Sequence, residues 1–261
     1  MSTITRAAHR VLGTRQVNQL VRFVPVLRAL DGMTPGRLLD VGSGSTGIAP
    51  LLPAGWTVVA LDADFADYGA LVTGTRRSPR VQGDVAALPF HDGAFDAVVA
   101  VDLLEHVPPA RRARAVDELC RVASRRAVIA CPTGDDARAS DRRIRDALVA
   151  RGATVPPWLD EHLDNGFPTR DELVACAARH GHVDVAGNES AAAHARVTLA
   201  ELRPATAVPL RLGARVLARG LRARQSAARA TATRLVRRLG GSDKAPTYRS
   251  VVCVDRRHTR E

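Results

Sequence analysis

The fold of this chain is decided by one stretch of sequence, LLDVGSGSTG at residues 38–47. Its first part is apolar except for Asp40 and predicts a buried strand over residues 37–41. Its second part has glycines at positions 42, 44 and 47, which allow a sharp turn and a close approach of the backbone to a ligand. A strand followed by a glycine-rich turn and a short helix is the first unit of an α/β fold.

Short apolar runs alternate with helical patterns along the rest of the chain. Further strands are predicted at residues 56–61, 80–83, 95–101, 127–131, 182–186 and 248–254. Helices are predicted at residues 16–30, 110–124 and 140–151, and from the capping box at Thr169 to Gly181. Since the strands are mostly apolar on both faces, we expect a parallel sheet covered by helices on both sides.

The composition is that of a globular protein with a sizeable core. Of 261 residues, 46% are hydrophobic and 25% charged, which excludes wholesale disorder. Only 3% are aromatic, which disfavours a nucleic-acid binder that stacks bases. The four cysteines form no C-x-x-C pair, so neither a disulfide scaffold nor a zinc site is expected. Because no apolar run approaches about 18 residues and no secretory signal is visible, we expect a cytoplasmic protein.

The glycine-rich turn fits G-x-G-x-x-G, the fingerprint of dinucleotide-binding folds. Asp62 lies 20 residues beyond Gly42, at the end of the next strand, where a carboxylate accepts hydrogen bonds from ribose hydroxyls. These features alone predict an NAD-dependent oxidoreductase. Asp40 favours a nucleoside ligand other than NAD. A carboxylate directly before the turn would repel the pyrophosphate of NAD and would attract an ammonium group. Asp84, at the end of the third strand, could accept a hydrogen bond from an adenine amino group.

Four stretches follow one another in a characteristic order: LLDVGSGSTG, VVALDAD, VQGDVAALPFHDGAFDAVVAVDLLEHVPP and RRAVIACP. With them the chain resembles the class I S-adenosylmethionine-dependent methyltransferases, close to the methyltransferase type 11 and quinone-methylase group. The resemblance covers about residues 36–190 and the last strand. It implies a Rossmann-like α/β sheet with strand order 3-2-1-4-5-7-6, in which strand seven, residues 248–254, is antiparallel, and a helical insertion before that strand.

The resemblance also implies a cofactor, S-adenosyl-L-methionine, and the residues that would hold it. These are Asp40, Gly42, Ser43 and Gly44 for the methionine end, Asp62 for the ribose, Ala63, Asp84 and Val85 for the adenine, and Val101 and Asp102 for the side of methyl transfer. For each aspartate the alternative is a helix N-cap, a frequent role of Asp at a strand-to-helix turn.

Methyl transfer from a sulfonium depends mainly on proximity and orientation, and needs a general base only when the acceptor is protonated. The candidate bases are His106, which follows the fourth strand, and His162, which lies between Trp158 and Phe167 in a segment that could line an acceptor pocket. The alternatives are a packing histidine and a solvated helix. Three further histidines, His180, His182 and His194, are interpreted as surface residues. No metal-ligand spacing stands out, so no metal site is predicted.

The positive charge is concentrated in one segment of the chain. The formal net charge is +11, and residues 202–242 contain ten arginines and no acid. We expect a helical segment at 1–35, a methyltransferase-like domain at 36–190 and 247–257, and a basic helical insertion at 191–246. The insertion has four possible roles: a lid on the sheet, a helix on an anionic membrane surface, a nucleic-acid contact or a partner-protein surface.

The resemblance implies methyl transfer to O or N of a small-molecule, glycan or lipid-linked acceptor. Residues 202–242 would make peripheral contact with the inner membrane face, and no nucleic-acid partner is expected. The alternatives are a quinone or secondary-metabolite methylase, an NAD-dependent oxidoreductase, and a binding protein of the same fold without turnover. The sequence leaves the acceptor and the oligomeric state open.

Overall fold

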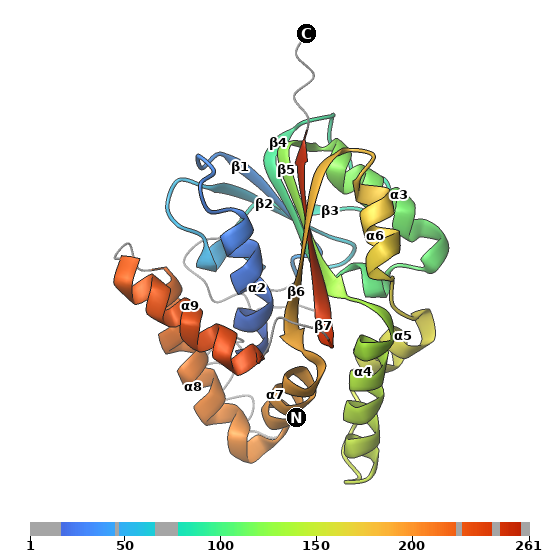
Figure 1. Cartoon of the computed structure of the whole chain (residues 1–261), viewed down its shortest axis with the longest axis vertical. Helices are drawn as coiled ribbons and strands as arrows, with labels where there is room; N and C mark the ends of the chain where they lie inside the picture. Colours follow the sequence, from blue (N-terminus) through green and yellow to red (C-terminus); the bar gives the residue numbers. More distant parts are fainter. Residues whose placement is uncertain (1–16, 45–46, 66–77, 223–225, 242–245, 257–261) are drawn as a thin grey trace.

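A computed structural model describes residues 17–44, 47–65, 78–222, 226–241 and 246–256. Its centre is a seven-stranded sheet with strand order β3-β2-β1-β4-β5-β7-β6 (Figure 1). The strands are β1 (Arg37–Val41), β2 (Thr57–Asp62), β3 (Arg80–Gln82), β4 (Phe95–Val101), β5 (Ala123–Pro132), β6 (Gly181–Ser190) and β7 (Thr247–Arg256). The first five strands pair in parallel, and β7 is antiparallel to β5 and β6. The expected sheet order and the antiparallel last strand are confirmed.

Helices cover both faces of the sheet (Figure 1). They are α2 (Val17–Ala29), α3 (Pro109–Arg121), α4 (Gly134–Val149), α5 (Pro157–Asn165), α6 (Arg170–Ala177), α7 (Ala191–Leu202), α8 (Pro204–Leu221) and α9 (Ser226–Gly240). Leu119 of α3 and Leu173 of α6 join one buried cluster with Leu39 of β1. Val21 of α2 belongs to a second cluster on the opposite face. None of the helices in the described ranges is long and apolar enough to cross a membrane.

The helix that follows the glycine-rich turn after β1 is shorter than the sequence motif predicts. Only a single 3-10 turn, η1 (Ala49–Leu51), follows Gly47. Pro50 stands at its start, Leu52 is extended with ψ 145°, and Pro53 comes next. Because a proline excludes the helical conformation from the residue before it, the helix ends after one turn.

The predicted basic insertion forms α7, α8 and α9, which pack against α2 rather than standing apart from the sheet. Ala214 and Leu221 of α8 and Val236 of α9 are buried in the same cluster as Val21. The helical structure expected for this insertion is confirmed in its described residues. The division of the chain into domains stays a prediction, since a shared core joins these helices to α2.

Candidate active site

The glycine-rich turn is held against the end of β2. The amides of Gly42 and Ser43 both donate to the carbonyl of Leu61, over 2.8 and 3.2 Å. Gly42 and Gly44 have φ of 69° and 57°, a region that favours glycine. A side chain at Gly42 would also approach Leu103 to 2.9 Å. The turn therefore requires glycine for its backbone conformation and for its close packing.

Asp40 lies at the bottom of this turn and is almost fully buried, with 3% of its surface exposed. Its Oδ2 accepts a hydrogen bond of 2.8 Å from the Ile48 amide, and a side chain at Gly47 would overlap the same oxygen. Burial raises the pKa of the Asp40 carboxyl from 3.8 to about 7, although the Ile48 amide lowers it. A buried carboxylate that is costly to ionise is stabilised by a nearby cation.

Asp62 joins the end of β2 to the same turn. Its Oδ2 accepts a 2.8 Å hydrogen bond from the Gly44 amide, and its Oδ1 accepts one of 3.4 Å from the Asp64 amide. Ala63 beside it is exposed, and its carbonyl accepts a 2.9 Å bond from the side chain of Gln82 in β3. Asp40, Asp62 and the glycines thus come together at the carboxyl ends of β1 and β2, as the sequence predicts.

Asp84 lies at the next strand end and is half-exposed. It accepts a hydrogen bond of 2.9 Å from the Ala86 amide and forms an ion pair with Arg111 of α3. The Ala86 amide and the Arg111 guanidinium hold the pKa of this carboxyl below its usual value. Val85 is partly buried next to it. Asp84 therefore stands ionised at the rim of the site, and its role toward adenine stays a prediction.

Asp102 follows Val101 at the end of β4 and is held by two arginines. Its oxygens accept bonds of 2.5 and 2.8 Å from Arg249 of β7 and one of 3.0 Å from Arg22 of α2. Burial alone would raise the pKa of Asp102, but the two guanidinium groups outweigh it and keep the pKa well below 3.8. Asp102 also has a φ of 50°, an uncommon backbone conformation that occurs at functional sites. Whether it lines the methyl-transfer side stays a prediction.

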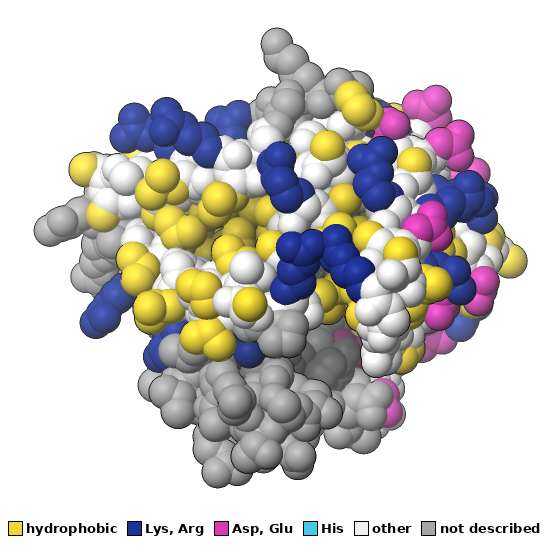
Figure 2. All heavy atoms as spheres, turned by 90° about the horizontal axis from the view of Figure 1, so that it is seen from below, with side chains coloured by type: hydrophobic (Ala, Val, Ile, Leu, Met, Phe, Trp, Pro, Cys, Tyr) yellow, Lys and Arg dark blue, Asp and Glu magenta, His cyan; other side chains and the backbone are white. Residues whose placement is uncertain are grey.

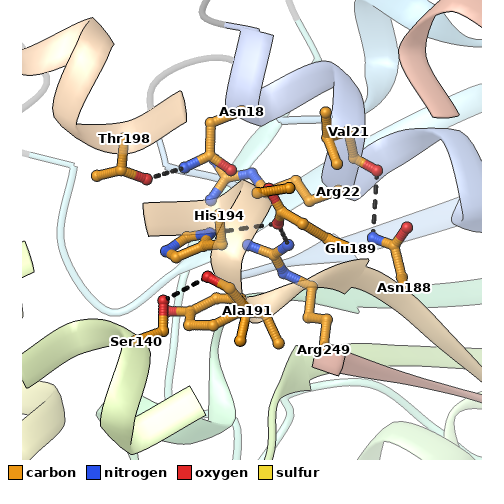
Figure 3. Close-up of polar contacts among 12 residues, drawn as sticks. Asn18, Val21, Arg22, Ser140, Asn188, Glu189, Ala191, His194, Thr198 and Arg249 are labelled. Atoms are coloured by element: carbon orange, nitrogen blue, oxygen red, sulfur yellow. Dashed lines mark hydrogen bonds and ion pairs between the residues drawn. The ribbon is translucent and has the colours of Figure 1, made fainter. Parts of the chain in front are cut away.

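Besides Asp102, Arg249 contacts a buried polar cluster that contains Glu189 and His194 (Figure 3). Its Nη1 lies 2.5 Å from Oε2 of Glu189, and the same oxygen lies 3.2 Å from Nδ1 of His194. His194 is 3% exposed, so its interpretation as a surface residue is wrong. Its polar partner Glu189 lies five residues earlier, at the end of β6, and draws the imidazole inward. Arg249 could not be singled out from sequence, because nothing local distinguishes it from the other arginines.

The two candidate bases lie in direct contact, although 56 residues separate them in the sequence. His106, in the short turn η3 (Leu104–His106), and His162, in α5, have their Nε2 atoms 3.2 Å apart. The rings of Trp158 and Phe167 lie against His162, with centroid distances of 5.1 and 5.7 Å. Burial and the neighbouring His162 ring lower the pKa of His106 below 6.5. The lowered pKa favours the neutral form of His106, which is the form that a general base requires.

Glu105, which sequence reasoning missed, lies beside this histidine pair and is fully buried. Neither of its carboxyl oxygens has a hydrogen-bond partner among the residues that the structure describes. Burial and the nearby Asp102 raise the pKa of Glu105 well above 4.5. A buried carboxyl group without a partner is uncommon in proteins and calls for an explanation. Glu105 and His106 are neighbours in the sequence, but His162 lies 56 residues beyond His106. No local sequence pattern therefore indicates this cluster.

Comparison with known proteins agrees with this geometry. Residues 39–131 match the family model described as a methyltransferase domain. Two curated relatives are the demethylmenaquinone methyltransferases of Renibacterium salmoninarum, 43% identical over 96 residues, and of Beutenbergia cavernae, 41% identical over 141 residues. The matches cover 35% and 52% of this chain, and 38% and 49% of those proteins. The chain thus spans half or less of the length of both relatives.

Solved structures share the fold at low sequence identity. A putative methyltransferase from an antibiotic biosynthesis pathway of Anabaena variabilis has a TM-score of 0.54 and 13% identity, over 89% of this chain and 96% of that one. The plantazolicin methyltransferase BpumL, solved in complex with SAH, has a TM-score of 0.54 and 11% identity, over 92% and 85%. These similarities show the fold, and the family match shows the domain. Residues 39–131 thus match a methyltransferase domain, and the sheet order and glycine-rich turn agree with those of the class I S-adenosylmethionine-dependent methyltransferases.

Proposed function

We propose that this protein transfers a methyl group from S-adenosyl-L-methionine to an oxygen or nitrogen of a small-molecule acceptor. The observation that carries the proposal is the meeting of Asp40, the glycine-rich turn and Asp62 at the ends of β1 and β2. When bound, this cofactor supplies an activated methyl group on a sulfonium. The task left to the chain is to orient the two reactants and to remove a proton from the acceptor where one is present.

The residues fit this cofactor better than a dinucleotide. Asp40 is buried directly below the turn, where a carboxylate favours an ammonium group and disfavours a pyrophosphate. Asp62 is partly exposed and has oxygens that could accept bonds from ribose hydroxyls. Gly42 and Gly44 have positive φ and no side chain, so a bound ligand could approach the backbone closely there. This combination of donor and acceptor groups argues against an NAD-dependent oxidoreductase.

For the acceptor side, support comes from the residues around His162. Trp158 and Phe167 provide aromatic surface, and His106 is a neutral imidazole next to it. This arrangement suits a planar acceptor that carries a hydroxyl or amine group, with His106 in the role of general base. Relatives that are named demethylmenaquinone methyltransferases make a quinone-type ring the second candidate acceptor.

A surface on α8 supports an acceptor that is linked to lipid. Val208, Leu212 and Val216 are 40%, 56% and 67% exposed and follow one another at helical spacing. Figure 2 shows hydrophobic side chains bordered by basic ones on the side of the molecule where α8 and α9 lie. Exposed apolar residues beside arginines are typical of helices that lie on anionic membranes. We therefore propose peripheral contact of residues 202–242 with an anionic membrane surface.

The function is tested by transfer of a labelled methyl group from S-adenosylmethionine. The acceptors to compare are phenols and catechols, aromatic amines, and reduced quinones in detergent micelles. We expect transfer to at least one hydroxyl- or amine-bearing ring and a loss of turnover of about 100-fold or more in His106→Ala, in line with the usual contribution of a general base. Absence of transfer to every acceptor by a protein that binds S-adenosylhomocysteine would favour a binding protein without turnover.

A further inference from the structure

Three potential metal ligands from η3 and α5 converge beside the end of β4. One ligand atom each from Glu105, His106 and His162 lies within 4.8 Å of the other two. The Nε2 atoms of the two histidines are 3.2 Å apart. At zinc–nitrogen distances of about 2.0–2.1 Å, two histidine ligands of a tetrahedral ion stand roughly 3.3–3.4 Å apart. The histidine pair therefore already has the separation that one shared metal ion requires.

The hydrogen bonds behind the two rings determine which nitrogen faces inward. Nδ1 of His106 lies 2.9 Å from Oε2 of Glu161, and Nδ1 of His162 lies 2.9 Å from Oδ2 of Asp141. A carboxylate only accepts hydrogen bonds, so each Nδ1 must carry the hydrogen. In a neutral imidazole the other nitrogen then presents a lone pair. Two lone pairs that face each other at 3.2 Å repel, unless a proton or a metal cation lies between them.

Carboxylates behind metal-binding histidines are a regular feature of metal sites, because they orient the ring and make the ligand nitrogen more basic. Asp141 is itself fixed in place, since its second oxygen accepts a 3.0 Å bond from the Tyr248 hydroxyl. Asp141 is fully buried, whereas Glu161 is half-exposed. One ring is therefore held rigidly inside the protein, and the other stands closer to solvent, where an ion would enter.

The buried Glu105 supplies an independent indication of a ligand. Both of its oxygens lack a partner among the described residues, and its side chain belongs to the same cluster. The charges of Arg249 and Arg22 act on Glu105 from a distance, but both guanidinium groups pair with Asp102, and among the described residues none donates a hydrogen bond to Glu105. A divalent ion held by both histidines would provide Glu105 with the positive partner that its burial demands.

We propose that Glu105, His106 and His162 bind one divalent metal ion of the zinc type. Two imidazole nitrogens and one carboxylate oxygen are a donor set that suits Zn²⁺ and its neighbours in the first transition row, and not Ca²⁺ or Mg²⁺. The proposal departs from the expectation of no metal, which rested on sequence spacing alone. It assembles only because α5 packs against η3.

Three protein ligands leave a fourth tetrahedral position open, as in catalytic zinc sites. The cluster adjoins Leu103, which packs against Gly42 of the glycine-rich turn, so that position lies near the proposed cofactor. An acceptor hydroxyl bound there would lose its proton more readily, and His106 would then serve as a ligand rather than as a base. This last step rests on the proposed function, whereas the binding of the metal does not.

The test is a titration of tag-free, chelator-treated protein with Co²⁺, followed by visible absorption. We expect one equivalent per chain and the intense d–d bands of a tetrahedral or five-coordinate site, with Zn²⁺ displacing Co²⁺. The spectrum reports on the site whether or not the protein transfers methyl groups. Loss of activity without loss of the spectrum would therefore concern the proposed function only.

Variants identify the ligands. His162→Gln and the isosteric Glu105→Gln should abolish or alter the Co²⁺ spectrum, and Asp141→Asn should weaken affinity by roughly 10–100-fold through the loss of ring orientation. The matched control is His180→Gln, since Nε2 of His180 also bonds a carboxylate, Asp117, over 2.7 Å but lies outside the cluster. Circular dichroism checks that each variant is folded.

Two results would overturn the proposal. The first is that the wild-type protein shows no d–d bands with Co²⁺ in excess, which would mean that a proton, not a metal, lies between the histidines. The second is that folded Glu105→Gln and His162→Gln bind Co²⁺ with the wild-type spectrum and affinity, whatever the result for His180→Gln. That outcome would place the metal elsewhere.

Discussion

At the scale of single residues, the three aspartates of the site differ in their surroundings. Asp62 accepts two backbone hydrogen bonds at the rim of the site, Asp40 is buried beneath it, and Asp102 is neutralised by two arginines. Asp62 is the one placed to bind a ligand hydroxyl without first losing an ion pair. It is therefore the position where a single substitution tests cofactor binding most simply.

Replacing Asp62 with alanine should weaken binding of S-adenosylhomocysteine about tenfold or more, because a hydrogen bond to a charged acceptor contributes roughly 1.5–3 kcal/mol. Calorimetry measures the dissociation constant, and Asp64→Ala, an exposed neighbour on the same loop, is the control. An unchanged dissociation constant in folded Asp62→Ala would contradict the assignment of Asp62 to the ribose.

Glu201 in α7 makes stability depend on pH. Burial raises the pKa of its carboxyl from 4.5 to about 7, although it accepts a hydrogen bond of 3.2 Å from the Asn18 amide. Because the folded-state pKa is the higher one, the protonated carboxyl stabilises the fold at low pH. This contribution is lost as pH rises from about 4.5 to about 7.

We therefore expect the free energy of unfolding to fall between pH 5 and 8, and Glu201→Gln to flatten part of this slope. At pH 8 the variant should be more stable than the wild type by roughly 3 kcal/mol, since the pKa shift is about 2.5 units and each unit corresponds to about 1.4 kcal/mol. Urea denaturation at both pH values measures the difference. A variant with the full wild-type slope would show that Glu201 ionises freely in the folded protein.

At the scale of elements, β7 and α2 jointly hold the end of β4. Arg249 of β7 is buried between Asp102 and Glu189, and Arg22 of α2 reaches the same Asp102. Because Arg249 neutralises two carboxylates in the core, its removal would leave both of them without their main partner. The antiparallel last strand thus fixes the geometry next to the site as well as completing the sheet.

Arg249→Met should destabilise the protein by about 3–5 kcal/mol, the usual cost of breaking a buried ion pair on one side. Arg179→Met, which breaks the exposed pair with Asp117, is the control and should have little effect. Chemical denaturation gives both values. If the two substitutions cost the same, the buried network does not hold β4 and β7 together.

The elements near the site were predictable from sequence to the extent that their signals are local. The strand, turn and carboxylate patterns of residues 38–47 and 56–62 are contiguous, and the structure confirms the strands and the described part of the turn, residues 42–44. The pairing of Asp102 with Arg249 joins residues 147 apart, and that of His106 with His162 joins residues 56 apart. Neither pairing leaves a local pattern, because each arises only when β7 and α5 pack against the end of β4.

At the scale of the whole molecule, charge and exposed apolar surface gather on the side of α8 and α9 (Figure 2). The inner face of α8 is buried against α2, so the helix is part of the core and also presents Leu212 and Val216 outward. A lid on the sheet and a membrane-binding surface are therefore compatible roles for opposite faces of one helix. The two roles can be distinguished by testing whether the outer face of α8 binds a membrane.

The protein should sediment with phosphatidylglycerol vesicles at low salt and release as salt rises, because each basic residue near an anionic surface contributes about 1 kcal/mol within a Debye length. Leu212→Ser with Val216→Ser should reduce binding without affecting the fold. Val149→Ser is the control, since Val149 is 55% exposed on α4, away from this surface. No sedimentation of the wild type at low salt would leave α8 with the role of a lid alone.

The central claim is that the turn at residues 42–47, with Asp40 and Asp62, binds the adenosyl cofactor of a methyltransferase. Isothermal calorimetry of the full chain with S-adenosylhomocysteine and, separately, with NAD tests it most directly. The geometry predicts saturable binding of S-adenosylhomocysteine at one site per chain and no binding of NAD. Binding of NAD without binding of S-adenosylhomocysteine would contradict the account.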